Sequence, residues 1–167
     1  VFASSLGYRA PSISSVSSSE SGNRMATNGG STITIVGSDF GPASVTPVSA
    51  SFGPSSSNGN ETLLTSCEVT TSHTVMRCGG AAGTGTGHHF RVLVAGQESI
   101  MSTGSLNFVA PSISAFREVG GGTASPTLAT SGGSTFLVIG SSFGPVASGA
   151  GGHITFTYKS GAYAASL

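Results

Sequence analysis

The sequence contains few charged residues, and this scarcity excludes several classes of protein. Only 7% of its 167 residues are charged, and six Lys and Arg balance six Asp and Glu to a formal net charge of +0. An ordinary soluble domain carries about 25% charged residues. Six scattered cations do not form the basic surface that nucleic-acid binding requires, so we expect no nucleic-acid partner. No apolar run reaches the about 18 residues of a membrane-spanning helix, so the segment has no predicted membrane span.

Patterns for catalysis and metal binding are also missing. Asp39 is the only aspartate, which leaves too few carboxylates for a calcium cage. His88 and His89 are adjacent, and neighbouring side chains of a strand point to opposite faces, so they would not share a metal ion. Residues 83–87 alternate Gly and Thr but lack the Lys and the helix start of a phosphate loop. No nucleophile-elbow sequence accompanies the serines. We therefore expect no catalytic residue, no metal, no cofactor and no enzymatic activity.

Hydroxyl side chains are abundant instead: Ser and Thr make up roughly three residues in ten. Two explanations of how such a surface stays soluble remain open. The hydroxyls solvate the protein by themselves, or they carry sugars. The single sequon, at Asn60, is a candidate N-glycosylation site beside a turn-forming Asn-Gly pair. Residues 17–19 and 55–57 are Ser runs, which are either O-glycosylation candidates or plain flexible loops.

Three sequence blocks occur twice in the chain. The paired blocks are residues 10–14 and 110–114, residues 28–32 and 131–135, and residues 36–42 and 139–145. The offset is 100 residues for the first pair and 103 for the other two. A period of about one hundred residues is too long for a solenoid unit and suits a whole small β domain. The repeat therefore indicates part of a tandem array.

The apolar residues of the complete repeat alternate with polar ones, which is typical of strands with one face in a core. Gly, Pro and Asn-Gly turns separate these segments. We predict seven strands, at residues 11–16, 31–37, 48–52, 67–70, 74–78, 90–95 and 105–109. Seven short strands in about one hundred residues are typical of an immunoglobulin-like β-sandwich. The buried Trp and long inter-sheet disulfide of antibody domains are missing, since the chain has no Trp.

The opening of the repeat resembles the IPT/TIG domain family. The matching residues are Pro11-x-Ile13, the Gly-Gly-Ser-Thr-Ile-Thr-Ile-Val-Gly run at 29–37, and Phe40-Gly41. A later Cys-to-Cys region of that family is similar to residues 67–78, with a slightly longer middle here. The resemblance covers residues 10–109 fully and 110–158 in part. It implies tandem immunoglobulin-like sandwiches, as used in surface receptors, bacterial and algal surface proteins, some transcription factors and some polysaccharide-acting enzymes, with no catalytic residues of their own.

This layout divides the chain into three parts. Residues 1–9 are similar to the last strand of a preceding repeat, residues 10–109 form one complete domain, and residues 110–167 form an incomplete second one. The chain begins at Val1 without a signal peptide, so we expect a processed product or part of a longer chain. The border at Ala110 and Pro111 should be extended and stiff, because proline fixes its own φ and disfavours helix before it.

The second domain lacks counterparts of several strands that complete the first. By the repeat alignment, nothing in residues 110–167 corresponds to the segments at 67–78, 90–95 and 105–109. Phe136, Val138 and Phe156 would then be exposed beside unpaired strand edges, which aggregate unless they are covered. We expect residues 110–167 to be completed by further chain or by a neighbouring subunit in an ordered polymer.

Cys67 and Cys78 are the only cysteines. A hairpin that places them opposite each other also places Glu68 opposite Arg77 and the apolar residues Val69 and Met76 together on one face, with residues 71–74 as the turn. This parity predicts a disulfide on one face and an ion pair on the other. Closing such a loop stabilises a fold by roughly 3 kcal/mol in the chain-entropy model. The alternative is two free buried cysteines in a reducing compartment.

These patterns predict that the protein is a non-enzymatic structural or adhesive module of an extracellular filament or cell-surface protein. A disulfide indicates an oxidising compartment, and a tandem repeat favours self-association or continuation into further repeats. A glycan- or ligand-recognition ectodomain is the second hypothesis. An accessory domain of a polysaccharide-acting enzyme is the third.

Overall fold

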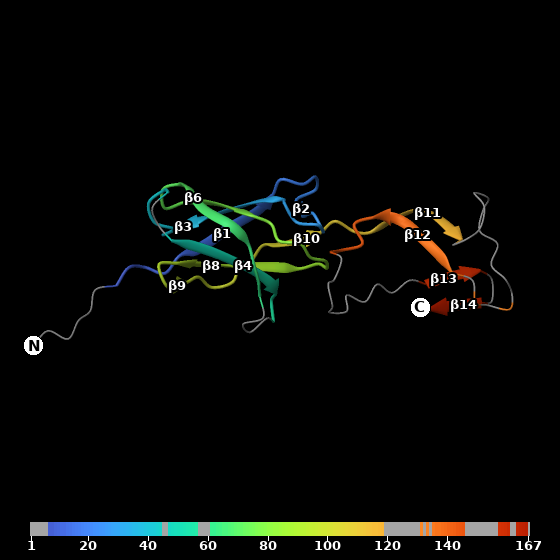
Figure 1. Cartoon of the computed structure of the whole chain (residues 1–167). Coiled ribbons are helices and arrows are strands. Elements are labelled where there is room, and N and C mark those ends of the chain that lie inside the picture. Colours follow the sequence, from blue (N-terminus) through green and yellow to red (C-terminus); the bar gives the residue numbers. More distant parts are fainter. Residues whose placement is uncertain are drawn as a thin grey trace, which may run out of the picture. The chain divides into compact units, whose positions relative to one another are not determined.

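The structure is a computed structural model, and it describes residues 7–44, 47–56, 61–118, 131, 133, 135–145, 157–160 and 163–166. The chain divides into two compact units, unit 1 at Val1–Ala110 and unit 2 at Pro111–Leu167. The described residues form strands and turns and contain no helix, so the expected all-β fold is confirmed (Figure 1).

Unit 1 contains two sheets. The first has four antiparallel strands in the order β1-β3-β7-β6. Their bounds are Ser12–Ser18 for β1, Thr32–Ser38 for β3, Val75–Gly79 for β7 and Thr65–Thr71 for β6. The Gly-Gly turn and the Phe-Gly pair, which flank β3 in the sequence, include residues in the left-handed region, with φ of 83° at both Gly30 and Gly41. Glycine adopts these angles without strain, so β3 is held between two sharp turns.

The second sheet has the order β2-β10-β8-β4-β5, with β9 paired to β8. Its strands are β2 (Arg24–Met25), β10 (Ser105–Phe108), β8 (His88–Val94), β4 (Val48–Pro54), β5 (Thr62–Leu63) and β9 (Gln97–Glu98). The β10–β2 pair is parallel and the others are antiparallel. Pro54 stands at the end of β4, where a missing backbone donor is tolerated.

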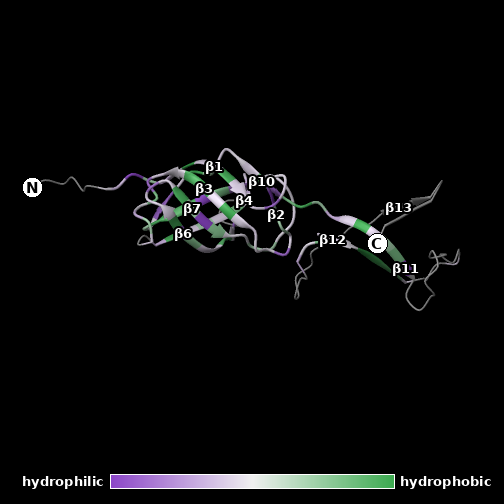
Figure 2. Ribbon diagram, turned by 90° about the horizontal axis from the view of Figure 1, so that it is seen from above, coloured by the Kyte–Doolittle hydropathy of each residue, from purple (hydrophilic) through white to green (hydrophobic). Residues whose placement is uncertain are grey.

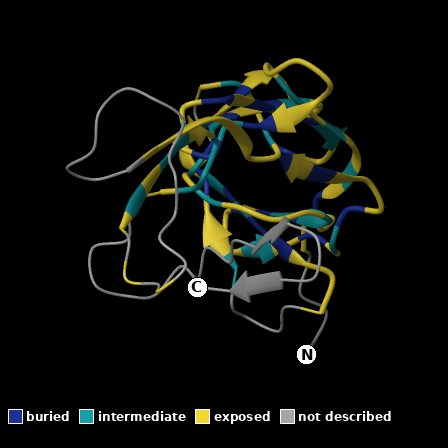
Figure 3. Cartoon of the chain, turned by 90° about the vertical axis from the view of Figure 1, so that its right-hand side faces the viewer, coloured by how far each residue is buried: buried dark blue, intermediate teal, exposed yellow. Residues whose placement is uncertain are grey.

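The core of unit 1 is built by alternation along both sheets. Ile33 and Ile35 of β3 and Phe90 and Val92 of β8 are each 0% exposed. Apolar and polar residues alternate along the strands (Figure 2), and buried residues alternate with exposed ones (Figure 3). The remaining buried apolar residues are Met25, Phe40, Ala50, Phe52, Leu64, Val69, Met76, Cys78, Val94, Leu106 and Phe108. Two sheets that share one apolar core are consistent with a β-sandwich.

All seven predicted strands of the complete repeat are present, with shifted ends. The sixth starts at His88 instead of Phe90, and the fourth starts at Thr65 instead of Cys67. The prediction missed β2, β5 and β9, because each has two residues and is too short to show a period.

The described residues of unit 2 form two antiparallel strand pairs. β11 (Ser112–Glu118) pairs with β12 (Phe136–Ser141), and β13 (Thr157–Ser160) pairs with β14 (Tyr163–Ser166). Phe156, one of the residues expected to be exposed, lies outside the described residues.

The β11–β12 pair repeats the geometry of the β1–β3 pair. Each has a register shift after its first Ile, between Ile13 and Ser15 in unit 1 and between Ile113 and Ala115 in unit 2. In unit 1 the hydroxyls of Ser12 and Ser38 are 2.9 Å apart, and the two serines at the same place in unit 2 are also 2.9 Å apart. The sequence repeat is therefore also a repeat of strand register.

Candidate functional surfaces

The β6–β7 hairpin contains the disulfide that its parity predicts. Cys67 and Cys78 are bonded to each other, with their Cα atoms 4.1 Å apart, and the chain has no free cysteine. Glu68 lies opposite Arg77 and Val69 opposite Met76, as in the predicted register. The backbone N–H of Thr74 donates to the carbonyl of Thr71 over 3.1 Å, which closes the predicted turn.

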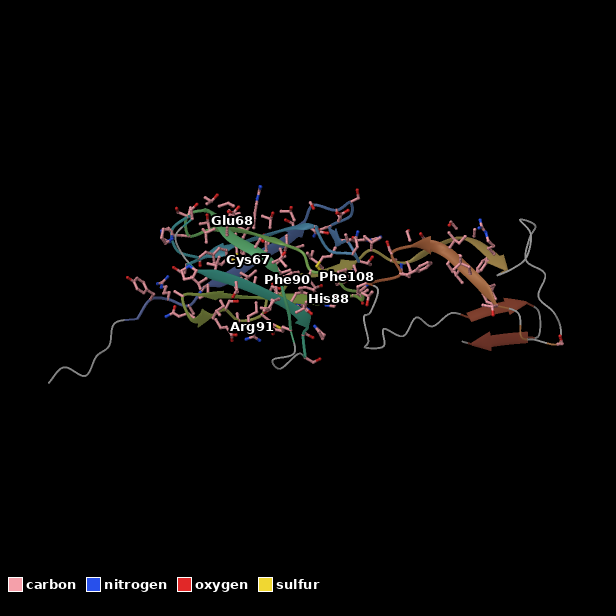
Figure 4. All side chains as sticks on the ribbon, in the orientation of Figure 1. Cys67, Glu68, His88, Phe90, Arg91 and Phe108 are labelled. Carbon is pink, nitrogen blue, oxygen red and sulfur yellow. A yellow bond between two sulfur atoms is a disulfide. The ribbon has the colours of Figure 1, made fainter. Side chains whose placement is uncertain are left out.

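The two faces of this hairpin have different roles. Val69, Met76 and Cys78 are buried in the core, whereas Glu68 and Arg77 are exposed (Figure 4 labels Cys67 and Glu68). The predicted ion pair is wrong: these two charged side chains face each other but form no salt bridge, and both salt bridges among the described residues involve Arg91. An exposed pair gains little in water, where ordering two long side chains offsets the attraction. The hairpin is thus amphipathic, and the disulfide lies on the face that packs against the core.

A small charge cluster lies on the outer face of the second sheet. The Arg91 Nε donates to Glu61 Oε1 over 3.2 Å, and its Nη1 donates to Glu98 Oε2 over 3.2 Å. The Ser51 hydroxyl also donates to Glu61, whose side chain is only 9% exposed. The sequence analysis missed this cluster because its members come from three separate segments. The signal was present, since Arg91 is the only Arg, Lys, Asp or Glu on β8 and stands on its outward face.

The two adjacent histidines have different surroundings. The His88 ring packs edge-on between Phe52 and Phe108, at centroid distances of 5.4 and 5.2 Å (Figure 4). Its Nε2 is 3.0 Å from the carbonyl oxygen of Thr84, so this nitrogen carries the donated proton. His89 Nδ1 is 2.8 Å from the Ser102 carbonyl. In the part of the chain that the structure describes, no three His, Cys, Asp or Glu side chains gather as a metal site would require.

The Gly-Thr segment at residues 83–87 packs against the strands of the second sheet. The Gly83 N–H donates to Thr27 over 3.1 Å, and the Phe108 N–H donates to the Gly85 carbonyl over 3.0 Å. A Cβ added at Gly83 would lie 2.6 Å from the Phe108 ring. Glycine is required there by close packing, because the ring occupies the space of a side chain.

A cavity of about 420 Å³ lies at the start of unit 1. It is lined by Tyr8, Arg9, Asp39, Gly41, Pro42, His73, Val94, Ala95 and Gln97. The Gln97 side-chain amide donates to the Tyr8 carbonyl over 3.0 Å, while the Tyr8 side chain is 94% exposed. An exposed aromatic ring beside several polar groups can stack on and hydrogen-bond a small polar ligand.

The apolar residues of unit 2 are more exposed than their counterparts. Ile113, Phe116 and Leu137 are 48%, 45% and 52% exposed. Val138 and Phe143 are half-buried, whereas the residues at these places in unit 1 are completely buried.

The remaining predicted positions are the sequon, a serine run and the border between the domains. The candidate sequon residue Asn60 lies outside the described residues, and Ser55 and Ser56 form a turn. Ala110 and Pro111 stand on either side of the division between the units.

The described residues include no helix long and apolar enough to cross a membrane. Comparisons with protein-family models, curated proteins and solved structures found no match to the chain.

Proposed function

We propose that this protein is a non-enzymatic structural or adhesive module of an extracellular filament or cell-surface protein, built from tandem immunoglobulin-like repeats of the IPT/TIG kind. The observation that carries the proposal is the repeated register of β1–β3 and β11–β12, down to the same irregularity and the same serine pair. A chain in which the same strand pair occurs twice is organised as an array. Arrays of small sandwich domains extend over long distances and expose binding surfaces.

The sheet order of unit 1 supports the immunoglobulin-like part of the proposal. Naming β1, β3, β4, β6, β7, β8 and β10 as strands A to G gives A-B-E-D for one sheet and G-F-C within the other. Immunoglobulin constant-type sandwiches have ABED in one sheet and CFG in the other. The central pairs β3–β7 and β4–β8 are the pairs B–E and C–F of that arrangement.

The extracellular part rests on the disulfide and the surface. A bond between Cys67 and Cys78 persists in an oxidising compartment. Exposed Ser side chains along β1 and a charged-residue content of only 7% suit a hydroxyl-rich surface that carries sugars. Self-association into a homopolymer, or continuation into further repeats, follows from the array.

Two measurements on native material test the proposal. Negative-stain microscopy should show filaments or beaded rods with a regular spacing, and the mass of the intact chain should exceed that of 167 residues by further repeats and glycan. Unglycosylated single particles without a repeat would contradict it.

Ligand recognition is the second candidate, favoured by the cavity beside Tyr8. Its aromatic ring and the polar groups of Arg9, Asp39 and Gln97 suit a sugar. Substituting Tyr8→Ala should then abolish retention on a glycan array while leaving filaments intact, and retained binding would remove this candidate.

A further inference from the structure

Among the described residues, no strand lies beside Val138 and Gly140 on the edge of β12 that faces away from β11. In the part of the chain that the structure describes, the sheet that contains β12 has only the strands β11 and β12. Its counterpart β3 lies between β1 and β7. In unit 1, β7 therefore occupies the edge that corresponds to this edge of β12.

Backbone direction identifies which groups of β12 face that edge. In unit 1 the Gly37 N–H donates to the Thr74 carbonyl just before β7, over 2.9 Å. The Val36 carbonyl instead accepts from the Ser14 hydroxyl on the β1 side, over 2.9 Å. Because these directions alternate along a strand, Ile35 and Gly37 direct their backbone groups toward β7.

The same alternation holds in unit 2. The Ile139 carbonyl accepts from the Ser114 hydroxyl over 3.1 Å, on the β11 side. By the offset of 103 residues, Val138 and Gly140 take the places of Ile35 and Gly37. Their N–H and C=O groups thus point to the edge away from β11.

The inner face beside this edge is apolar and partly open. Ile35 is 0% exposed in unit 1, where it lies opposite Met76 of β7, which is also 0% exposed. Its counterpart Val138 and the nearby Phe143 are only half-buried, and Ile113 is 48% exposed. Unpaired backbone groups beside an apolar face form an acceptor for an added strand.

We propose that β12 is an acceptor for an antiparallel β-hairpin of the β6–β7 kind, which adds its second strand to this edge with an apolar residue opposite Val138. The register is that of Ile35 with Met76 in unit 1. The inference rests on the repeated register and goes beyond the proposed function, because it defines a binding edge and the chemistry of its partner.

A hairpin fits this edge better than a single strand. In unit 1, β7 alone does not cover the core: Val69 of β6 is 2% exposed and lies opposite Met76. An isolated two-stranded hairpin is marginally stable in water, but the Cys67–Cys78 bond ties these two strands together. The oxidised peptide of residues 64–80 from this chain is therefore a suitable probe.

The test is a titration of the ¹⁵N-labelled full chain with this oxidised peptide, followed by NMR. Saturable binding should shift the amide signals of Val138 and Gly140 and slow their hydrogen exchange. The chain's own hairpin in unit 1 is not displaced, because its tether gives an effective concentration on the order of millimolar. No binding, or shifts confined to unit 1, would overturn the proposal.

Matched variants separate strand addition from general stickiness. Val138→Asp should weaken binding by about tenfold or more, since it places a charge in the apolar contact. Ile139→Asp makes the same change on the opposite face and should alter binding by less than about threefold. A peptide with Val69→Ser and Met76→Ser keeps the disulfide and should bind about tenfold more weakly or worse. Equal losses for both chain variants, or protected Val138 and Gly140 amides in chain that self-associates without peptide, would contradict a hairpin partner.

Discussion

The strand pairs β1–β3 and β11–β12 share a backbone register but differ in burial. Ile33, Ile35 and Phe40 of the first unit are 0% exposed. In the second unit their counterparts Phe136, Val138 and Phe143 are half-buried. The local sequence is sufficient to define the strand pairing, the β-bulge after the first Ile and the hydrogen-bonded serine pair, because both units have them. Burial requires a second sheet, which unit 1 supplies through β4, β8 and β10. The comparison therefore separates what a segment does locally from what its neighbours add.

The largest expected difference in stability between the two strand pairs is for a substitution at one inward-facing apolar position. Ile35→Ala should lower the free energy of unfolding of unit 1 by about 2–5 kcal/mol, because it empties a packed core. Val138→Ala should cost less than about 1 kcal/mol, since that side chain is already half in water. Urea unfolding of both full-length variants measures the difference. Equal losses would mean that unit 2 has a core as complete as that of unit 1.

The disulfide provides the second test, because it ties together the β6–β7 hairpin that pairs with the edge of β3. The double variant Cys67→Ser, Cys78→Ser should lose roughly 3 kcal/mol of stability in unit 1. The β11–β12 pair should be unaffected. Thermal unfolding of the variant, compared with the oxidised wild-type chain, measures the loss, and the wild-type chain in reductant should unfold like the variant. Peptide mapping without reduction offers a check on connectivity, and a bond to another chain would refute the hairpin register.

The third test concerns a closely packed glycine that both strand pairs contain, Gly37 in unit 1 and Gly140 in unit 2. A Cβ at Gly37 would overlap the Ser12 carbonyl oxygen and lie 2.5 Å from Phe40 Cζ, and Gly140 meets the equivalent atoms of unit 2. Gly37→Ala should cost about 1–3 kcal/mol by overpacking. Gly140→Ala should cost about 1 kcal/mol, because Ile113 and Phe116 of β11 are about half-exposed, so the strand that provides the overlapping Ser112 carbonyl can shift. Gly104→Ala is the control, since nothing lies within 4 Å of that position. Denaturant unfolding and NMR of all three variants would detect a reversed order.

The smallest effect is expected on the outer face of unit 1, where burial is not the cause of stability. Glu98→Gln should change stability by less than about 0.5 kcal/mol, since the Glu98 side chain is 60% exposed and its ion pair is solvated. Arg91→Gln should cost about 1 kcal/mol or more, because it leaves the mostly buried Glu61 carboxylate with one partner fewer. Thermal unfolding at low and high salt measures both. A larger loss for Glu98→Gln would show that the exposed pair stabilises the sheet.

The sequence was most predictive for contacts between residues of one short segment. The parity of residues 67–78 predicted the disulfide and the hairpin register, because both strands and their turn lie within twelve consecutive residues. It failed for the Glu68–Arg77 ion pair, since strand register fixes backbone position but not the solvated ends of long side chains. The cluster around Arg91 was missed for another reason. It joins residues 30 positions apart, and a sequence read without its pairings does not bring them together.

The claim that β3 is paired on both edges and β12 on one is tested most directly by amide hydrogen exchange of the native chain, measured at single residues in these two strands. In β3, Ile35 and Val36 should both exchange slowly, because strands lie on both edges. In β12, Ile139 should exchange slowly through its bond to β11, and Val138 should exchange at least about tenfold faster. Equal protection of Val138 and Ile139 in monomeric chain would contradict the account, since the edge of β12 would then already be covered.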